Sequence, residues 1–222
     1  MPEYHNEVGK LSSFPRVTLG GLTERSLASY QMEQVGNNCA VHSISTSFWL
    51  LSGWELSPSE LAEELDNLPF LPRLPFRMWR DGPISPMQQV HLVHTLAKGA
   101  HLHIKAHLTH PGPADLVELI RKPDTAVLVT IGWRRGHAPV ISLGENTTSE
   151  ADNTHSLWHT MIAAAHDPLH RDSAGTPKPW GLINSWVNGG EALYWMPDAD
   201  FKRAWSCFTP FGGIRPAVVI EK

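Results

Sequence analysis

The chain has few cysteines and no long apolar run. Its 222 residues contain only two cysteines, Cys39 and Cys207, too few for a disulfide framework. No apolar stretch approaches the roughly 20 residues that a membrane-spanning helix needs, so no membrane partner is expected. Residues 1–7 lack the basic region followed by an apolar one that marks a secretory signal. A cytoplasmic protein is therefore the expectation, with signal-independent export left open.

An excess of charge is also missing. Eighteen Lys and Arg residues stand against 22 Asp and Glu residues, which gives a net charge of −4 without a run of either sign. This balance argues against nucleic acid as a partner. The hydrophobic fraction of 41% and the charged fraction of 18% are typical of folded globular proteins. The length suffices for one well-filled domain, expected over residues 30–222 and preceded by an N-terminal arm over 1–29.

The hydrophobic pattern places helices early and strands late. This order predicts an α+β fold with a largely antiparallel sheet, split into a helical lobe over about 30–100 and a sheet lobe over about 101–222. The loops at 68–83, rich in proline, and at 142–156 are expected beside a cleft. Helices are predicted over 39–51, 57–65, 85–96 and 114–121, and strands over 100–108, 126–131, 159–165, 181–184, 192–196 and 217–220.

Local signals fix several of these boundaries. Ser57 and Glu60 have the spacing of a capping box, with Pro58 at the first helical position. Gly99 is expected to stop the helix that Ser85 opens. Trp54, Trp79, Trp133 and Trp205 are expected in the core or in a cleft wall.

Cys39 stands where a polar turn becomes an apolar helix. The local sequence is Gln34-Val35-Gly36-Asn37-Asn38-Cys39, and Asn37 or Asn38 is suited to capping the helix. Only the thiolate attacks an amide, and a free thiol with a pKa near 8.5 is only a few per cent ionised at neutral pH. The unpaired N–H groups of a helix N-terminus favour negative charge and lower that pKa. The sequence therefore predicts Cys39 as a nucleophile.

His159 and Asn184 are the residues that such a thiol requires as partners. His159 opens an apolar strand, and Asn184 begins the triplet Asn184-Ser185-Trp186 after another. A histidine cation beside the thiolate lowers the thiol pKa further and returns a proton to the leaving amine. The asparagine would orient the ring, with Trp186 covering the bond between them. Gln34 and the backbone N–H of Cys39 are the predicted oxyanion donors.

This order of residues resembles the papain-like cysteine peptidases. The resemblance covers about residues 30–200 and is specific only around Cys39, 158–167 and 180–190. His159 lies 120 residues after Cys39 and Asn184 lies 145 after it. The guide for the papain group is roughly 130–150, so the asparagine fits and the histidine falls slightly short. Without a disulfide set, the chain looks more like the bacterial peptidase C39-like proteins than a lysosomal cathepsin.

The resemblance implies a papain-like fold, in which the cysteine-bearing helix packs against a mostly antiparallel sheet. It also implies a cysteine peptidase that hydrolyses a peptide or isopeptide bond of a peptide or protein substrate and needs no cofactor. An acyltransferase or a deamidase would use the same thiol chemistry, and a catalytically silent binding module would keep only the fold. The triad itself does not distinguish these outcomes.

Other histidines and acids compete for the same roles. His42 lies three residues after Cys39 on the same helical face. His137 also follows an apolar strand, but Pro139 interrupts its pattern, which favours His159. Asp167 and Asp152 are alternative orienters in place of Asn184.

Two further patterns have simpler explanations than chemistry. Gly20-Gly21 resembles a double-glycine processing site and is interpreted as a plain turn. Thirteen histidines suggest a metal, but no second cysteine or carboxylate cluster completes a ligand set, so solvated faces and no metal are expected. The histidines with ligand-like spacing are His91, His94, His101, His103 and His107.

Overall fold

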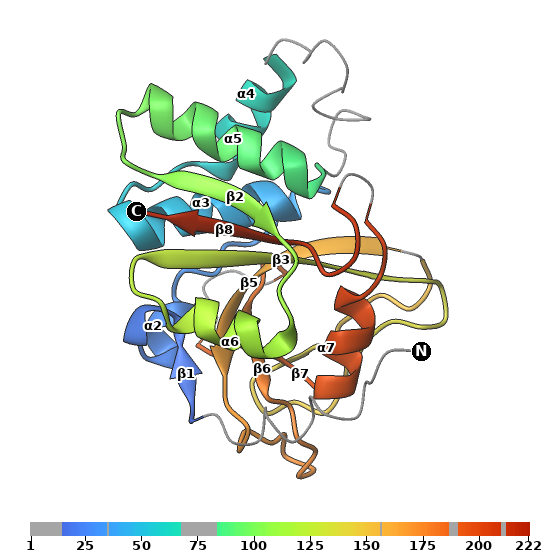
Figure 1. Cartoon of the computed structure of the whole chain (residues 1–222). Helices are drawn as coiled ribbons and strands as arrows, with labels where there is room; N and C mark the ends of the chain where they lie inside the picture. The colour runs from blue at the N-terminus through green and yellow to red at the C-terminus, as the bar shows by residue number, and fades with distance from the viewer. Residues whose placement is uncertain (1–14, 35, 68–83, 156, 187–190, 210–211) are drawn as a thin grey trace.

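The computed structural model describes residues 15–34, 36–67, 84–155, 157–186, 191–209 and 212–222 (Figure 1). The predicted α+β class is confirmed: helices cover an eight-stranded sheet in which every strand pair is antiparallel. The predicted loop over 68–83, with Trp79, lies outside the described residues. No helix in the described part of the chain is long and apolar enough to cross a bilayer.

The elements follow the predicted order closely. The helices are η2 (Leu19–Gly21), α2 (Glu24–Ala28), α3 (Cys39–Ser52), α4 (Pro58–Asn67), α5 (Pro86–Gly99), α6 (Pro113–Arg121) and α7 (Asp198–Trp205). The strands are β1 (Val17–Thr18), β2 (Lys105–Thr109), β3 (Thr125–Trp133), β4 (Ser142–Leu143), β5 (Leu157–His166), β6 (Trp180–Ile183), β7 (Tyr194–Met196) and β8 (Ala217–Glu221).

Strand β5 is the centre of the sheet. The strand order is β2-β8-β3-β5-β6-β7-β4, and the short β1 adds to β5 as well. Between β3 and β5 the register runs from Leu128↔Ile162 to Trp133↔Leu157. His159 therefore pairs with Ile131 at a fixed position in the middle of this ladder. The strand that carries the predicted histidine is held from both sides.

Two apolar cores lie on the two faces of the sheet (Figure 1). Residues from α2, α3, α4 and α5 pack on one face, and residues from α6 and α7 pack on the other. Strand β3 serves both cores because its side chains alternate: Ala126 and Leu128 join the first, and Val127 and Val129 join the second. A strand buried on both faces explains the continuous apolar run seen in the sequence.

Helix α3 is buried along most of its length. Residues 39–48 are all buried, which is why its sequence lacks a charged face. Two of its buried hydroxyl groups bond to backbone outside the helix: Ser43 Oγ donates to the Thr160 carbonyl and Thr46 Oγ1 donates to the Tyr30 carbonyl. Such bonds offset the cost of burying polar groups, and the Ser43 bond connects the helix to β5.

The predicted strand over 100–108 begins later than expected. Helix α5 includes Gly99, and His101, not the glycine, takes the left-handed conformation with φ 55°. The Leu102 N–H then donates to the Ala97 carbonyl at 2.8 Å, which closes a Schellman-type turn. Strand β2 starts only at Lys105. The alternation of buried and exposed residues therefore begins before the strand does.

Three other differences are short elements. Helix α7 was not predicted; it begins after Pro197, with Asp198 and Asp200 in its first turn, where carboxylates favour a helix. Strand β4 lies inside the loop predicted over 142–156. Part of the segment predicted as an N-terminal arm enters the sheet, because β1 pairs with β5. Gly20 and Gly21 form a turn at positive φ.

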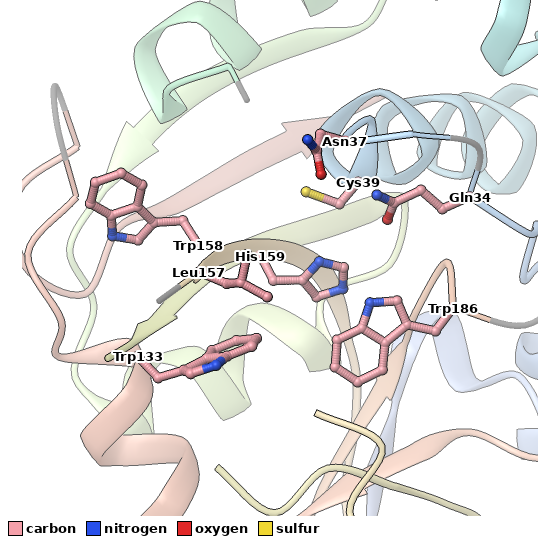
Figure 2. A pocket seen from close by; sticks show the side chains of 8 residues that line it. All are labelled: Gln34, Asn37, Cys39, Trp133, Leu157, Trp158, His159 and Trp186. Carbon is pink, nitrogen blue, oxygen red and sulfur yellow. The ribbon is translucent and has the colours of Figure 1, made fainter. Parts of the chain in front are cut away.

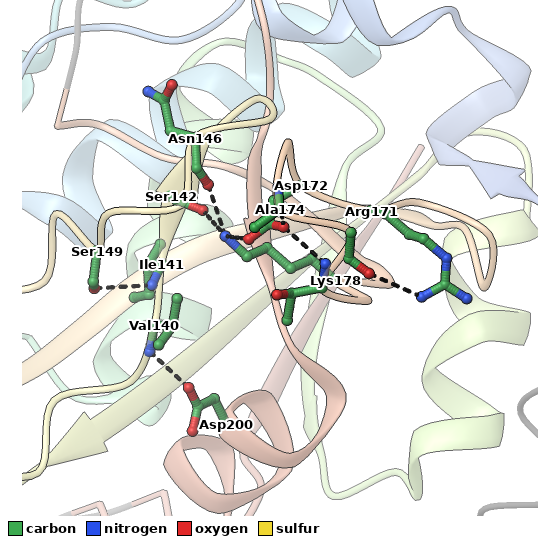
Figure 3. Close-up of polar contacts among 12 residues, drawn as sticks. Val140, Ile141, Ser142, Asn146, Ser149, Arg171, Asp172, Ala174, Lys178 and Asp200 are labelled. Atoms are coloured by element: carbon green, nitrogen blue, oxygen red, sulfur yellow. Dashed lines mark hydrogen bonds and ion pairs between the residues drawn. The ribbon is translucent and has the colours of Figure 1, made fainter.

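A buried ion pair fastens the loop after β5 to the segment around β4 (Figure 3). Lys178 is 1% exposed, and its ammonium group contacts three oxygens: Asp172 Oδ2 at 3.0 Å, Ser142 Oγ at 2.5 Å and the Asn146 carbonyl at 2.7 Å. All three ammonium donors are thus used. Burial raises the pKa of Asp172, but the Thr176 N–H and Lys178 outweigh it, so that the pKa lies below its usual value.

We expect Asp172→Asn to lower the urea midpoint of unfolding at pH 7, because Lys178 would remain buried without its counter-charge. The folded pKa of Asp172 lies below the unfolded value of about 3.9, so its contribution is complete above that value and is lost as the pH falls through the folded pKa. The difference between the variant and the wild type should therefore shrink below about pH 4. Urea titrations at several pH values measure it. Glu118→Gln, which breaks an exposed pair with Arg121, is the control and should change little.

Candidate active site

Cys39 is the first residue of α3 and lies against β5. Asn38 occupies the N-cap position, but its side chain makes no capping hydrogen bond to the helix. The Cys39 side chain is buried, with 7% of the residue exposed. The backbone N–H of Thr160, the residue after His159, points at Cys39 Sγ at 3.4 Å. The thiol therefore lies between a helix N-terminus and a strand N–H group, both of which favour negative charge.

His159 and Asn184 come together beside this thiol. His159 Nε2 and Asn184 Oδ1 are 2.7 Å apart, and both residues are buried, at 5% and 1% exposed. An amide oxygen only accepts, so Nε2 carries the proton of this bond. The ring therefore has Nδ1 left for the Cys39 thiol, whose pKa His159 lowers. Asn184 thus bonds to one nitrogen of the imidazole and leaves the other nitrogen for Cys39.

The surroundings of the pair hold it in place. The Trp186 ring stacks on the His159 ring, with centroids 4.8 Å apart and planes at 27°. Behind Asn184, the buried Gln31 accepts from the Asn184 N–H at 3.2 Å and donates to the Ala192 carbonyl at 2.9 Å. The stacked indole keeps water from the imidazole face, and Gln31 fixes the backbone that presents the amide.

The environment lowers the pKa of Cys39. Burial alone raises the pKa of this thiol, since it disfavours the charged form. The positive charge and hydrogen bond of His159, together with the N–H groups of Thr160 and Ala40, act in the opposite direction and outweigh it. The result is a buried thiol with a pKa below its ordinary value, which is the condition that nucleophilic cysteines meet.

Thr160 is itself fixed from two helices. Its carbonyl accepts from Ser43 of α3, and its hydroxyl oxygen accepts from Gln89 Nε2 of α5 at 3.2 Å. The same hydroxyl lies 3.0 Å from that of Thr130, its partner on β3. These contacts hold the N–H that faces Cys39 Sγ in a single direction.

Gln34 lies beside Cys39 and is tied to the segment that carries Asn184. Its Oε1 accepts from Ser185 Oγ at 2.8 Å, and its backbone N–H donates to the Ser185 carbonyl at 2.6 Å. The Gln34 side-chain nitrogen points toward Cys39 (Figure 2). One of its two N–H groups donates to the Gly36 carbonyl, which leaves the other available. With the backbone N–H of Cys39, this forms two donors near the thiol.

A pocket opens at the Cys39–His159 pair (Figure 2). It has a volume of about 270 Å³. Asn37, one of the two predicted caps, lines it, and so does Trp133 from the set of tryptophans expected in the core or in a cleft wall. The full lining consists of Gln34, Asn37, Cys39, Trp133, Leu157, Trp158, His159 and Trp186.

The competing residues lie elsewhere. The His42 ring donates from Nδ1 to the Asn38 carbonyl at 2.9 Å, a contact within its own helix. His137 is exposed in a turn after β3. Asp167 accepts from the Leu169 N–H and pairs with Arg16 at 3.6 Å.

Asp152 is engaged in its own loop, where hydrogen bonds from Thr154 and His155 lower its pKa to about 2. None of these four candidates lines the pocket.

Metal ligands do not gather in the described part of the chain. No group of three or more His, Cys, Asp or Glu side chains there is arranged to hold an ion. Of the histidines with ligand-like spacing, His94 is used structurally, since its Nε2 accepts from the Ala106 N–H at 3.0 Å.

Sequence reasoning missed several residues of the site. Trp158 adjoins His159 and Ser185 adjoins Asn184, so their proximity in the chain was a usable signal. Gln31, Gln89 and Thr160 act through contacts between distant elements, which no local pattern shows.

Comparisons of the sequence with models of known families and with curated proteins find no match.

We expect the alkylation of Cys39 by iodoacetamide to follow a pH profile with its midpoint below about 8.5, the value of an ordinary thiol. His159→Ala should move the midpoint upward, since burial then acts without the opposing cation. The rate is measured by intact mass in a Cys207→Ser background, so that a single thiol is counted. The midpoint, unlike the maximal rate, does not depend on reagent access. Identical midpoints with and without His159 would contradict this account.

Proposed function

We propose that the protein is a papain-like cysteine peptidase that hydrolyses a peptide or isopeptide bond in a peptide or protein substrate. The observation that carries the proposal is the bond of 2.7 Å between His159 Nε2 and Asn184 Oδ1, formed beside the buried Cys39 at a helix start. A buried structural cysteine needs neither an oriented imidazole nor a pocket. A papain-like fold is part of this proposal, supported by a cysteine-bearing helix packed on an antiparallel sheet that carries the histidine and the asparagine.

The proposed first half-reaction uses the groups around Cys39. The Cys39 thiolate attacks the carbonyl carbon of the scissile bond, and the oxyanion forms near the backbone N–H of Cys39 and Gln34 Nε2. The protonated His159 gives its Nδ1 proton to the leaving nitrogen as the C–N bond breaks. An amine leaves and a thioester of Cys39 remains. Asn184 holds the ring so that Nδ1 faces the reacting atoms throughout.

The second half-reaction reverses these roles. Neutral His159 removes a proton from water, which attacks the thioester carbonyl. The C–S bond then breaks, a carboxylic acid leaves, and the thiol–imidazole pair is restored. If an amine replaces water, the product is an acyl transfer. If the substrate is a glutamine side chain, the product is a deamidated one.

Product mass separates these outcomes on a library of peptides from a digested proteome, with analysis by mass spectrometry. Hydrolysis yields new termini, deamidation adds about one dalton, and transfer adds the amine. We expect new termini from the wild type and a loss of about a thousandfold or more with Cys39→Ala or His159→Ala.

Cys207→Ser is the matched control for loss of a thiol and should cleave like the wild type. An epoxide inhibitor of cysteine peptidases should add one adduct to the wild type and none to Cys39→Ala. If the wild type neither cleaves peptides nor forms an adduct with the epoxide, the proposed peptidase activity is excluded. A catalytically silent binding module is then favoured.

A further inference from the structure

The pocket beside Cys39 has two unlike walls (Figure 2). One wall is polar and consists of Gln34, Asn37 and Cys39. The other is formed by large apolar side chains around His159: Trp133, Leu157, Trp158 and Trp186. Apart from the Cys39–His159 pair, the described lining residues carry no charge, so a charged group entering here would lose water without gaining an ionic partner.

Trp158 is placed in this wall by a glycine on the neighbouring strand. Trp158 pairs with Gly132 across β5 and β3. A Cβ atom built on Gly132 would lie 2.6 Å from Cδ1 of the Trp158 indole, closer than carbon atoms approach. The indole thus lies directly on the strand backbone, an arrangement in which an aromatic ring covers a glycine in a sheet. Trp158 is nevertheless 45% exposed, an unusual state for so large an apolar side chain.

Trp133 and Leu157 line the pocket from the face of the sheet that carries His159, whereas Trp158 lies on the face toward α3. Trp133 and Leu157 are register partners at the end of the β3–β5 ladder, so their relative position is set by the sheet. The Trp133 Nε1–H donates to the Asp152 carbonyl at 2.8 Å, which satisfies its only polar atom. Trp133 therefore lines the pocket with the apolar carbon atoms of its ring. The surface is built on strands, which makes it a defined site rather than a loop contact.

The position of His159 decides which part of a substrate meets this surface. In the proposed reaction His159 protonates the leaving nitrogen, so that nitrogen must lie within hydrogen-bond reach of the ring. Leu157 and Trp158 precede His159 on β5, and Trp186 stacks on its ring. The group attached to the leaving nitrogen therefore lies against the apolar wall.

Resting on the proposed function, we infer that this wall binds the side chain of the residue on the amine side of the scissile bond and selects large apolar, above all aromatic, residues. Burial of an apolar side chain against the indoles that line this pocket is favoured in proportion to the area removed from water. A glycine at this position has no side chain to bury, and an acidic side chain would be desolvated without a partner. Selectivity of this kind amounts to about tenfold or more in rate.

The selectivity of the site can be measured in the reverse direction, by transfer of an acyl group from Cys39 to an added amine. This measurement needs no known peptide substrate. p-Nitrophenyl acetate transfers its acetyl group to Cys39 and releases p-nitrophenolate, leaving a thioester. An added amino-acid amide then competes with water: its nitrogen forms a bond to the carbonyl carbon, the C–S bond breaks, and the amine proton passes through His159 to the departing sulfur. By microscopic reversibility the incoming amine occupies the site of the leaving amine.

The measurement is the ratio of N-acetyl amide to acetate, by mass spectrometry, for the amides of tryptophan, phenylalanine, leucine, glycine and aspartate at equal concentration. We expect the aromatic amides to exceed those of glycine and aspartate by about tenfold or more. Trp158→Ala should reduce this preference several-fold, and Trp158→Phe should restore most of it. Each ratio is taken within one variant, so it does not depend on how much enzyme is active.

Leu169→Ala is the control, because Leu169 is 80% exposed and lies outside the pocket lining. It should leave the preference unchanged. If acetylation of Cys39 occurs but amide products are absent, or form without regard to side chain, the inference fails and the proposed function stands. An aromatic preference that survives Trp158→Ala would also overturn the assigned wall. If no p-nitrophenolate release depends on Cys39, the proposed function fails and the inference fails with it.

Discussion

The contact between the start of α3 and the middle of β5 is the constraint on which the rest of the site depends. It joins Cys39 Sγ to the Thr160 N–H and brings the thiol to the His159 ring. Ser43 and Gln89 fix the same residue of β5 from two helices. Shifting β5 by one residue would turn His159 to the other face of the sheet, so the two cores that set its register also keep His159 beside Cys39.

Two amide side chains connect the segments that form the site. Gln31 bridges the Asn184 N–H and the Ala192 carbonyl, and Gln34 bridges two groups of Ser185. Each network joins a residue of the helical side to the strand segment after β6. Buried hydrogen bonds of this kind are specific because an unpaired donor or acceptor is costly. Gln31 and Gln34 thus fix the position of the segment that carries Asn184 relative to the segment that precedes Cys39.

Much of this could be predicted from local sequence. The helix that begins at Cys39 and the strand that contains His159 follow from the hydrophobic pattern. The structure places Cys39, His159, Asn184 and Gln34 together. What local sequence could not show is contact between distant segments: Gln89 on Thr160, or Trp158 on Gly132. Helix α7 was not predicted because its eight residues are too few to show a clear helical periodicity. The start of β2 moved because a left-handed His101, rather than Gly99, closes α5.

The distance along the chain between Cys39 and His159 has a consequence for the newly made protein. The two residues are 120 positions apart, and the strand ladder that places His159 pairs β5 with β3, β6 and the early β1. Contacts over such separations form late, because the entropy of closing long loops must be met first. Until then Cys39 lacks both His159 and the Thr160 N–H, two of the groups that lower its pKa in the folded protein. The lowered pKa of this thiol is therefore a property of the completed fold and is absent from an unfinished chain.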